Sequence, residues 1–215
     1  MAIGGFSMRH FTTPITPIII LLLAIISWAA FMPPIGFLAH TLEGSGLSPT
    51  ETILLQFANA LIYFVVLCAL FALAWIDHIT MEIPDRFHII IAACGLFACF
   101  FGPGIGAKSH LIGIGVASVP LFLIMIVCLL LTGAEAFGFG DVKLMAAAGF
   151  FLGWQHTLVA LFIGIIIGGI YGSYLLATRK KGGKEHFAFG PALCFGIGIS
   201  MFAAEPIIKW YLQVL

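Results

Sequence analysis

Long runs of apolar residues, several close to 20 residues in length, constrain the fold of this chain more than any other feature of its sequence. Of its 215 residues, 62% are hydrophobic and only 8% are charged, and the mean hydropathy is +1.18. A run of about 20 apolar residues is enough for an α-helix to cross a bilayer. A water-soluble domain of this size could not bury so much apolar surface. The sequence therefore predicts an all-α polytopic membrane protein.

About seven hydrophobic segments are predicted, separated by short polar or glycine-rich breaks. Arg9 followed by an apolar run is typical of a signal peptide, but the run is long enough to span, so a retained first helix is favoured. The fifth segment is too short to cross a bilayer comfortably, and we expect it to be partly inserted. No internal repeat or soluble domain is visible, so residues 1–215 are expected to form one integral membrane domain. The segments are 17–38, 52–76, 87–102, 111–131, 144–154, 158–177 and 187–212.

The distribution of basic residues predicts an orientation, because lysine and arginine are more frequent in cytoplasmic loops. Seven crossings that start inside place the N-terminus in the cytoplasm and the C-terminus outside. They also place Asp77 and Asp141 together at the cytoplasmic boundary. The cytoplasmic basic residues would be Arg9, Arg86, Lys143, Arg179, Lys180, Lys181 and Lys184, against Lys108 and Lys209 outside.

Asp77 and Asp141 lie at the ends of two of these apolar segments. Ionisable groups near hydrocarbon cost several kcal/mol and usually face a protein cavity, which indicates function. Asp77 is expected near the carboxyl end of its helix and Asp141 at an amino end. The helix dipole would then favour a protonated Asp77 and an ionised Asp141. One neutral and one ionised carboxyl group can activate water and polarise a carbonyl, so the pair predicts an aspartyl protease.

Each of these acids also has a structural interpretation. Asp77 could be an interfacial acid among lipid headgroups, and Asp141 a helix N-cap. Asp85 is most simply the N-cap of the third helix, with a role at the site as the alternative. Lys143 could extend to the membrane interface or contact an acidic substrate group. Glu135 is interpreted as a loop charge in preference to a catalytic acid.

Glycine and proline residues near the aspartates predict a surface for an extended peptide. Gly138 and Gly140 lack side chains, so a substrate strand could lie against their backbone. Pro84 is expected to separate the second and third helices. Gly190 and Pro191 open the last segment, where they are either ordinary helix-start residues or a wall of the substrate groove.

Cysteine and charge patterns exclude other classes of protein. No CxxC pair is present, so a zinc knuckle or dithiol redox motif is not predicted. The net charge is zero, which gives no electrostatic case for nucleic acid. The five cysteines all lie inside apolar runs, where we interpret them as packing residues: Cys68, Cys94, Cys99, Cys128 and Cys194.

Three ordered motifs resemble those of the type IV prepilin leader peptidase family, the GxGD-type membrane aspartyl proteases. The similarity runs from about residue 74 to residue 191, within a family-like core of about 52–212. The first motif is Asp77 followed by Ile83-Pro84-Asp85. The second comprises Gly133, Glu135, Gly138, Gly140, Asp141, Lys143 and Leu144, continued by Ala146-Ala147-Ala148-Gly149 and Leu152-Gly153, and the third is Phe189-Gly190-Pro191.

The resemblance implies cleavage of basic leader peptides from type IV prepilins or pseudopilins at the cytoplasmic face of the bacterial inner membrane, for pilus assembly or protein secretion. It implies no metal or organic cofactor. The segment between the first two helices lacks the paired CxxC motifs of many members, which argues against N-methyltransferase activity. The oligomeric state stays open. Asp77 and Asp141 would be the catalytic pair, and the expected substrate-binding residues are Gly138, Gly140, Lys143, Pro84, Asp85, Glu135, Gly190 and Pro191.

Three rival interpretations remain. A presenilin or signal-peptide-peptidase type of protease shares GxGD, and Pro191-Ala192-Leu193 reproduces its PAL triplet, but Ile76 stands where that group has tyrosine. A proton-coupled transporter would use the two aspartates as relays, yet it favours an inverted repeat and midplane sites. A structural protein of a secretion system leaves the paired motifs unexplained.

Overall fold

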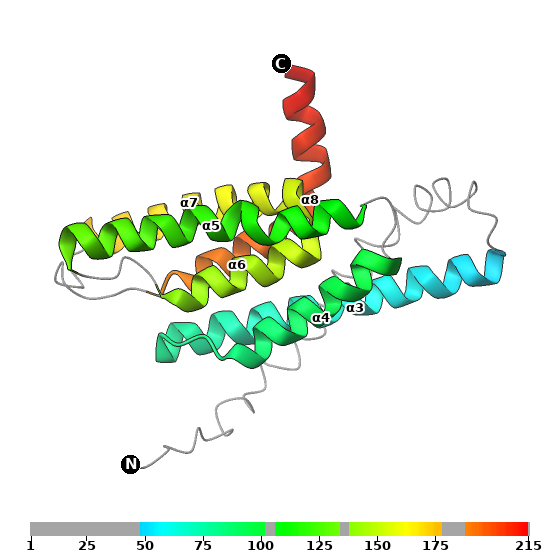
Figure 1. Cartoon of the computed structure of the whole chain (residues 1–215), viewed down its shortest axis with the longest axis horizontal. Coiled ribbons are helices and arrows are strands. Elements are labelled where there is room, and N and C mark those ends of the chain that lie inside the picture. Colours follow the sequence, from blue (N-terminus) through cyan, green and yellow to red (C-terminus); the bar gives the residue numbers. More distant parts are fainter. Residues whose placement is uncertain (1–47, 102–105, 134–137, 178–187, 215) are drawn as a thin grey trace, which may run out of the picture.

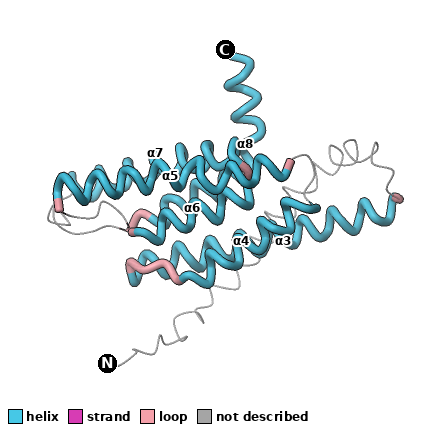
Figure 2. Tube along the Cα trace, viewed as in Figure 1, coloured by secondary structure: helices cyan, strands magenta, loops and turns pink. Residues whose placement is uncertain are grey.

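The computed structural model describes residues 48–101, 106–133, 138–177 and 188–214. Within these ranges every regular element is an α-helix, as Figure 2 shows, so the predicted all-α fold is confirmed. The first predicted segment, 17–38, lies outside the described residues. The six helices are α3 (Pro49–Thr80), α4 (Asp85–Phe101), α5 (Ala107–Thr132), α6 (Phe139–Leu152), α7 (Trp154–Ala177) and α8 (Gly190–Val214).

Local chemistry explains where α3 begins and ends. Ser48 and Glu51 form a capping box, with bonds of 3.3 Å from the Glu51 N–H to Ser48 Oγ and 2.8 Å from the Ser48 N–H to Glu51 Oε2. Such a cap satisfies backbone donors that a helix leaves unpaired. Met81 adopts the left-handed conformation (φ 55°) and ends the helix. Pro84 follows, and α4 starts directly after it, as the sequence predicted.

The start of α6 is the largest error in the predicted boundaries. The apolar run was expected to begin at 144, whereas the helix begins at Phe139. Hydropathy excluded Asp141 and Lys143 because both are charged, but both are helical, and Asp141 is buried. The two charged residues therefore belong to the first turns of a helix inside the bundle.

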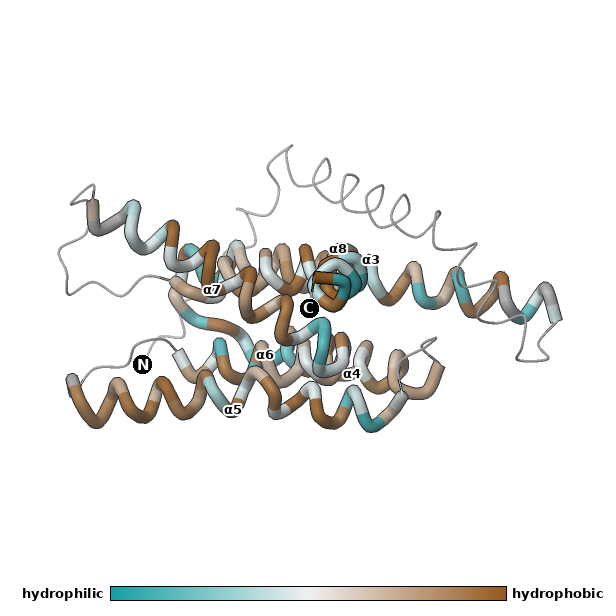
Figure 3. Tube along the Cα trace, turned by 90° about the horizontal axis from the view of Figure 1, so that it is seen from above, coloured by the Kyte–Doolittle hydropathy of each residue, from teal (hydrophilic) through white to brown (hydrophobic). Residues whose placement is uncertain are grey.

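Four of the described helices, α3, α5, α7 and α8, are long and apolar enough to cross a membrane. Their exposed residues include many large hydrophobic ones, such as Leu130 and Leu131 at 78% and 80% exposure, and Figure 3 shows α5 mostly brown. Exposed apolar area on this scale marks a lipid-facing surface. This chain is a multi-pass membrane protein. The fifth predicted segment is short as expected, because the 14 residues of α6 span only about 21 Å.

Successive helices run in opposite directions (Figures 1 and 2). The carboxyl ends of α3, α5 and α7 and the amino ends of α4, α6 and α8 gather at one end of the bundle, on the left in Figure 1. Helix α6 packs against α4, α5, α7 and α8, and nine of its residues are buried. The last turns of α8, after Pro206, lead away from the bundle. The two predicted aspartates thus belong to the same end of the molecule.

Glycine allows α5 and α6 to approach backbone to backbone. A Cβ added at Gly113 would clash with the carbonyl oxygen of Gly149, and one at Gly149 would clash with that of Gly113. Small residues are common at such helix contacts in membranes, where association depends on close packing. These two glycines fix α6 against its neighbour.

We expect Gly113→Ala to destabilise the protein by about 1–3 kcal/mol, because the added methyl group must push two helix backbones apart. Gly115→Ala is the matched control in the same helix, since its nearest neighbour would be a Val119 methyl at 3.8 Å. Unfolding in mixed detergent micelles measures both. Equal stability of the two variants would contradict the proposed backbone contact.

Candidate functional site

The first carboxylate, Asp77, lies in the last turn of α3 and is only 4% exposed. Its backbone carbonyl accepts a bond of 2.9 Å from the Met81 N–H, which closes the helix. Its side chain accepts a hydrogen bond from the Gly190 N–H, at the amino end of α8. Asp77 Oδ2 is buried and has no hydrogen-bond partner among the described residues. The Asp77 carboxyl group is therefore buried with at least one oxygen that the described protein atoms do not pair.

The second carboxylate, Asp141, occupies the first turn of α6 and is also 4% exposed. The N-cap is Gly138, so the interpretation of Asp141 as the N-cap is wrong. The Asp141 side chain instead reaches back to accept from the Gly138 N–H, while its own N–H donates to the Gly138 carbonyl at 3.0 Å. Asp141 Oδ1 is buried without a partner in the described part of the chain.

The two carboxyl groups interact electrostatically. Burial, together with the negative charge of Asp77, raises the pKa of Asp141 to about 7, although the Gly138 N–H acts in the opposite direction. The sequence-based expectation that the helix amino end would keep Asp141 ionised is therefore wrong, because desolvation outweighs the helix end. Asp141 holds a proton far more readily than an ordinary aspartic acid.

Backbone atoms approach closely around the pair. A Cβ at position 190 would lie 2.5 Å from Asp77 Oδ2, and one at position 140 would lie 3.0 Å from Ile83 Cβ. Gly190 is buried and Gly140 is half-buried beneath Ile83, whereas Gly138 is exposed. Of the glycines predicted to face a substrate, two are thus already in contact with the α3–α4 connection. Their lack of a side chain is required by the site itself.

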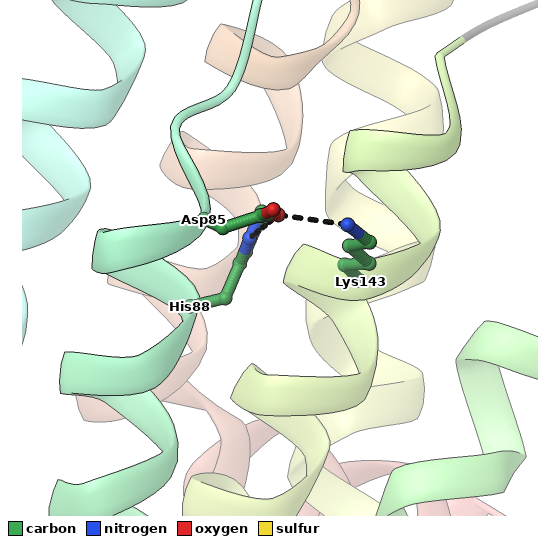
Figure 4. A network of polar contacts seen from close by, with 3 residues as sticks. All are labelled: Asp85, His88 and Lys143. Atoms are coloured by element: carbon green, nitrogen blue, oxygen red, sulfur yellow. Dashed lines mark hydrogen bonds and ion pairs between the residues drawn. The ribbon is translucent and has the colours of Figure 1, made fainter.

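Asp85, His88 and Lys143 form a polar cluster next to the pair (Figure 4). Lys143 Nζ donates to Asp85 Oδ1 at 2.8 Å, and His88 Nδ1 lies 3.5 Å from the same oxygen. Asp85 is the first residue of α4, and its carboxylate binds Lys143, so its predicted role as the N-cap is wrong. The hydrogen bond and charge of Lys143 lower the pKa of Asp85.

A cavity of about 430 Å³ lies beside the pair, between the carboxyl ends of α3 and α7 and the amino end of α8. It is mostly apolar. Its wall includes the helical neighbours of Asp77 and Gly190, and its lining residues include Ala74, Trp75, His78, Tyr171, Pro191 and Phe195. Pro191 lines this cavity, and its role as a wall of the substrate groove stays a prediction.

Three residues near the pair were not predicted from the sequence as site residues. Ile83 covers Gly140, His88 approaches Asp85, and the buried Cys194 lies within the electrostatic reach of both aspartates. A histidine three residues after Asp85 in an apolar helix was the one available signal. Glu135 lies outside the described residues. Within the described ranges, no group of three or more His, Cys, Asp or Glu residues could hold a metal ion.

Comparison with known proteins places the first two motifs in one family. A model described as the type IV leader peptidase family matches residues 64–173, which include Asp77 and Asp141. The chain is similar to proteins named prepilin leader peptidase/N-methyltransferase. That of Aeromonas salmonicida (strain A449) is 32% identical over 68% of this chain and 50% of the relative. Those of Pseudomonas putida and Legionella pneumophila are 30% and 31% identical over 73% and 75% of this chain, each with 54% of the relative covered.

The chain spans about half the length of the curated relatives that it matches. No solved structure matches it.

Substitution Gly190→Ala is expected to displace the Asp77 carboxylate, because the new methyl group would overlap Oδ2. We expect a loss of about 1–3 kcal/mol in stability, the usual cost of overpacking. Gly169→Ala in α7 is the control, since no atom lies within 4 Å of its added Cβ. Thermal unfolding in detergent micelles compares them, and an unchanged midpoint for Gly190→Ala would refute the contact.

Proposed function

Since this chain belongs to the type IV leader peptidase family, we propose that it is an aspartic endopeptidase that removes leader peptides from prepilins or pseudopilins. The observation that carries this proposal is the electrostatic interaction of two buried carboxyl groups from different helices, each with an oxygen that has no partner among the described residues. The names of the similar proteins, prepilin leader peptidase/N-methyltransferase, support the substrate class. We propose the peptidase step alone for this chain, and methyl transfer is not part of the proposal.

The chemistry follows from unequal protonation of the pair. We assign the proton to Asp141, whose raised pKa of about 7 favours the neutral form. Asp77, which lies against the Gly190 backbone at the amino end of α8, would then be the ionised base of the pair. Asp77 takes a proton from water, whose oxygen attacks the scissile carbonyl carbon, while Asp141 donates to the carbonyl oxygen. The leaving nitrogen then takes the proton from Asp77 as the C–N bond breaks. Asp141 regains a proton from a hydroxyl group of the tetrahedral intermediate, so the pair is again singly protonated.

The substrate is proposed to bind in an extended form across the exposed end of the site. Gly138 is exposed, and Pro84 is half-buried in the turn opposite. Pro191, next to Gly190, lines the adjacent cavity, which would take an apolar side chain of the substrate. At Gly140 and Gly190, the absence of a side chain would let the substrate backbone come close to the backbone of the enzyme. Glu135 stays a predicted substrate contact.

We propose that the site faces the cytoplasm in a bacterial inner membrane. Seven of the nine lysine and arginine residues fall on that side when the N-terminus is inside and the C-terminus outside. The arrangement of the helices supports a single aqueous face for both aspartates (Figure 1). The family match disfavours the presenilin-type and transporter interpretations.

Asp77→Asn and Asp141→Asn should each reduce leader removal by about 10²–10⁴-fold, because either change removes an ionisable group from the pair. Co-expression with a prepilin-like substrate, followed by gel analysis of leader loss, measures this. Glu82→Gln, which neutralises an exposed carboxylate of the α3–α4 turn, is the control and should cleave normally. Processing retained in either aspartate variant, with normal membrane insertion, would exclude the two-aspartate mechanism.

The pH dependence should show loss of activity as the pH rises through about 7. A raised pKa keeps the proton on Asp141 up to that pH, and above it both carboxyl groups are ionised and no acid remains. We expect kcat/KM for a purified prepilin-like substrate in detergent micelles to fall about tenfold per pH unit on this limb. A profile that stays flat up to pH 9 would show that the proton on Asp141 is not needed.

A further inference from the structure

The cluster of Asp85, His88 and Lys143 bridges the two helix ends that carry the proposed catalytic pair. Lys143 lies two residues after Asp141 in α6, and its ammonium group binds the first residue of α4 at 2.8 Å. That first residue, Asp85, follows the short turn that begins where α3 ends. A path of one turn and one ion pair therefore connects Asp77 to Asp141.

A second contact holds the same turn from the other side of Asp141. Ile83, two residues before Asp85, covers Gly140, where an added Cβ would lie 3.0 Å from Ile83 Cβ. The first turn of α6 is thus fixed at Gly140 and at Lys143, on both sides of the carboxylate. Both contacts are made with residues of the α3–α4 turn or the start of α4, and neither involves the exposed Gly138.

His88 completes the cluster from within. It is only 7% exposed, and Nδ1 lies 3.5 Å from the oxygen of Asp85 that also receives Lys143. Figure 4 shows Asp85 above His88, with its carboxylate directed to Lys143. The Asp85 carboxylate therefore has the His88 ring as a second neighbour beside Lys143.

Stability alone does not account for this cluster. The Asp85 and Lys143 side chains are 68% and 42% exposed. Ion pairs as exposed as this contribute about 0–1 kcal/mol. Position matters far more to catalysis, since a misplacement of about 1 Å can cost about 10²-fold in rate. Asp85 and Lys143 also satisfy each other's charge without any substrate.

We propose that Asp85, His88 and Lys143 form a positioning network that holds Asp141 in register with Asp77, in place of the substrate contacts expected for Asp85 and Lys143 from the sequence. The network acts through the first turn of α6, so its loss should affect kcat and leave KM nearly unchanged. This inference rests on the proposed peptidase activity.

A double-mutant cycle on Asp85→Asn and Lys143→Gln tests the network with a purified prepilin-like substrate in micelles. Each single variant should lower kcat about 10–100-fold. The kcat of the double variant should be no lower than that of the less active single variant, because both substitutions remove the same bond. The charge swap Asp85→Lys with Lys143→Asp should recover at least about fivefold over the worse of its two component single variants. His88→Asn should retain more activity than His88→Leu, because its amide can still approach Asp85.

Controls separate the failure of this inference from failure of the proposed function. If the unaltered protein does not cleave the substrate, the peptidase proposal itself fails. Arg86→Gln, which neutralises the exposed neighbour of Asp85, is the control for charge loss and should cleave normally. Where they cleave, KM values that rise at constant kcat, or single effects that multiply in the double variant, would overturn the network. Lys143→Arg, which can still bind Asp85, should keep most of the activity. Unfolding midpoints within a few degrees exclude misfolding as the cause, and the Lys143→Arg result decides the test if a neutral variant fails to fold.

Discussion

The cost of placing two carboxyl groups inside an apolar bundle governs the rest of this structure. Asp77 and Asp141 are each 4% exposed in a chain with very few charges. Neither has a described lysine or arginine as a direct partner, and each instead accepts from a backbone N–H at the amino end of a helix, that of Gly190 in α8 and that of Gly138 in α6. Backbone donors stabilise the pair without neutralising it. A proton can therefore move between the two groups and a bound reactant.

The same requirement explains the distribution of glycine. A backbone donor reaches a carboxylate only if no side chain keeps the two apart, and a Cβ at Gly190 would occupy the position of Asp77 Oδ2. Gly140 lets Ile83 approach, and Gly113 and Gly149 bring α5 onto α6. The motif glycines are therefore best explained first as residues that assemble the carboxylate pair. Gly138 differs from Gly140 and Gly190 in being exposed, so its backbone is not covered by the α3–α4 connection.

Much of this arrangement could be predicted from the sequence because it depends on local rules. The apolar runs gave the helices, Pro84 separated α3 from α4, and the alternation of helices brought Asp77 and Asp141 to one end. The predictions that failed concerned features that depend on burial or on distant partners. The charged residues Asp141 and Lys143 were left out of the predicted helix although α6 includes them, and the pKa of Asp141 rose because desolvation outweighed the effect of the helix end. The bond between Asp85 and Lys143 joins residues 58 positions apart, a separation that no local pattern encodes.

Because α6 is short, the two ends of the helix bundle differ in structure. A helix of about 21 Å that starts at the aspartate end stops well short of the opposite face of a hydrocarbon layer about 30 Å thick. There the chain reverses at buried Gly153, and buried Thr157 and Ser200 bond to nearby carbonyl oxygens. In a membrane, these packed side chains would separate the carboxyl groups from the far aqueous compartment. Solvent and protons would then exchange through one mouth only, so hydrolysis need not open a leak across the membrane.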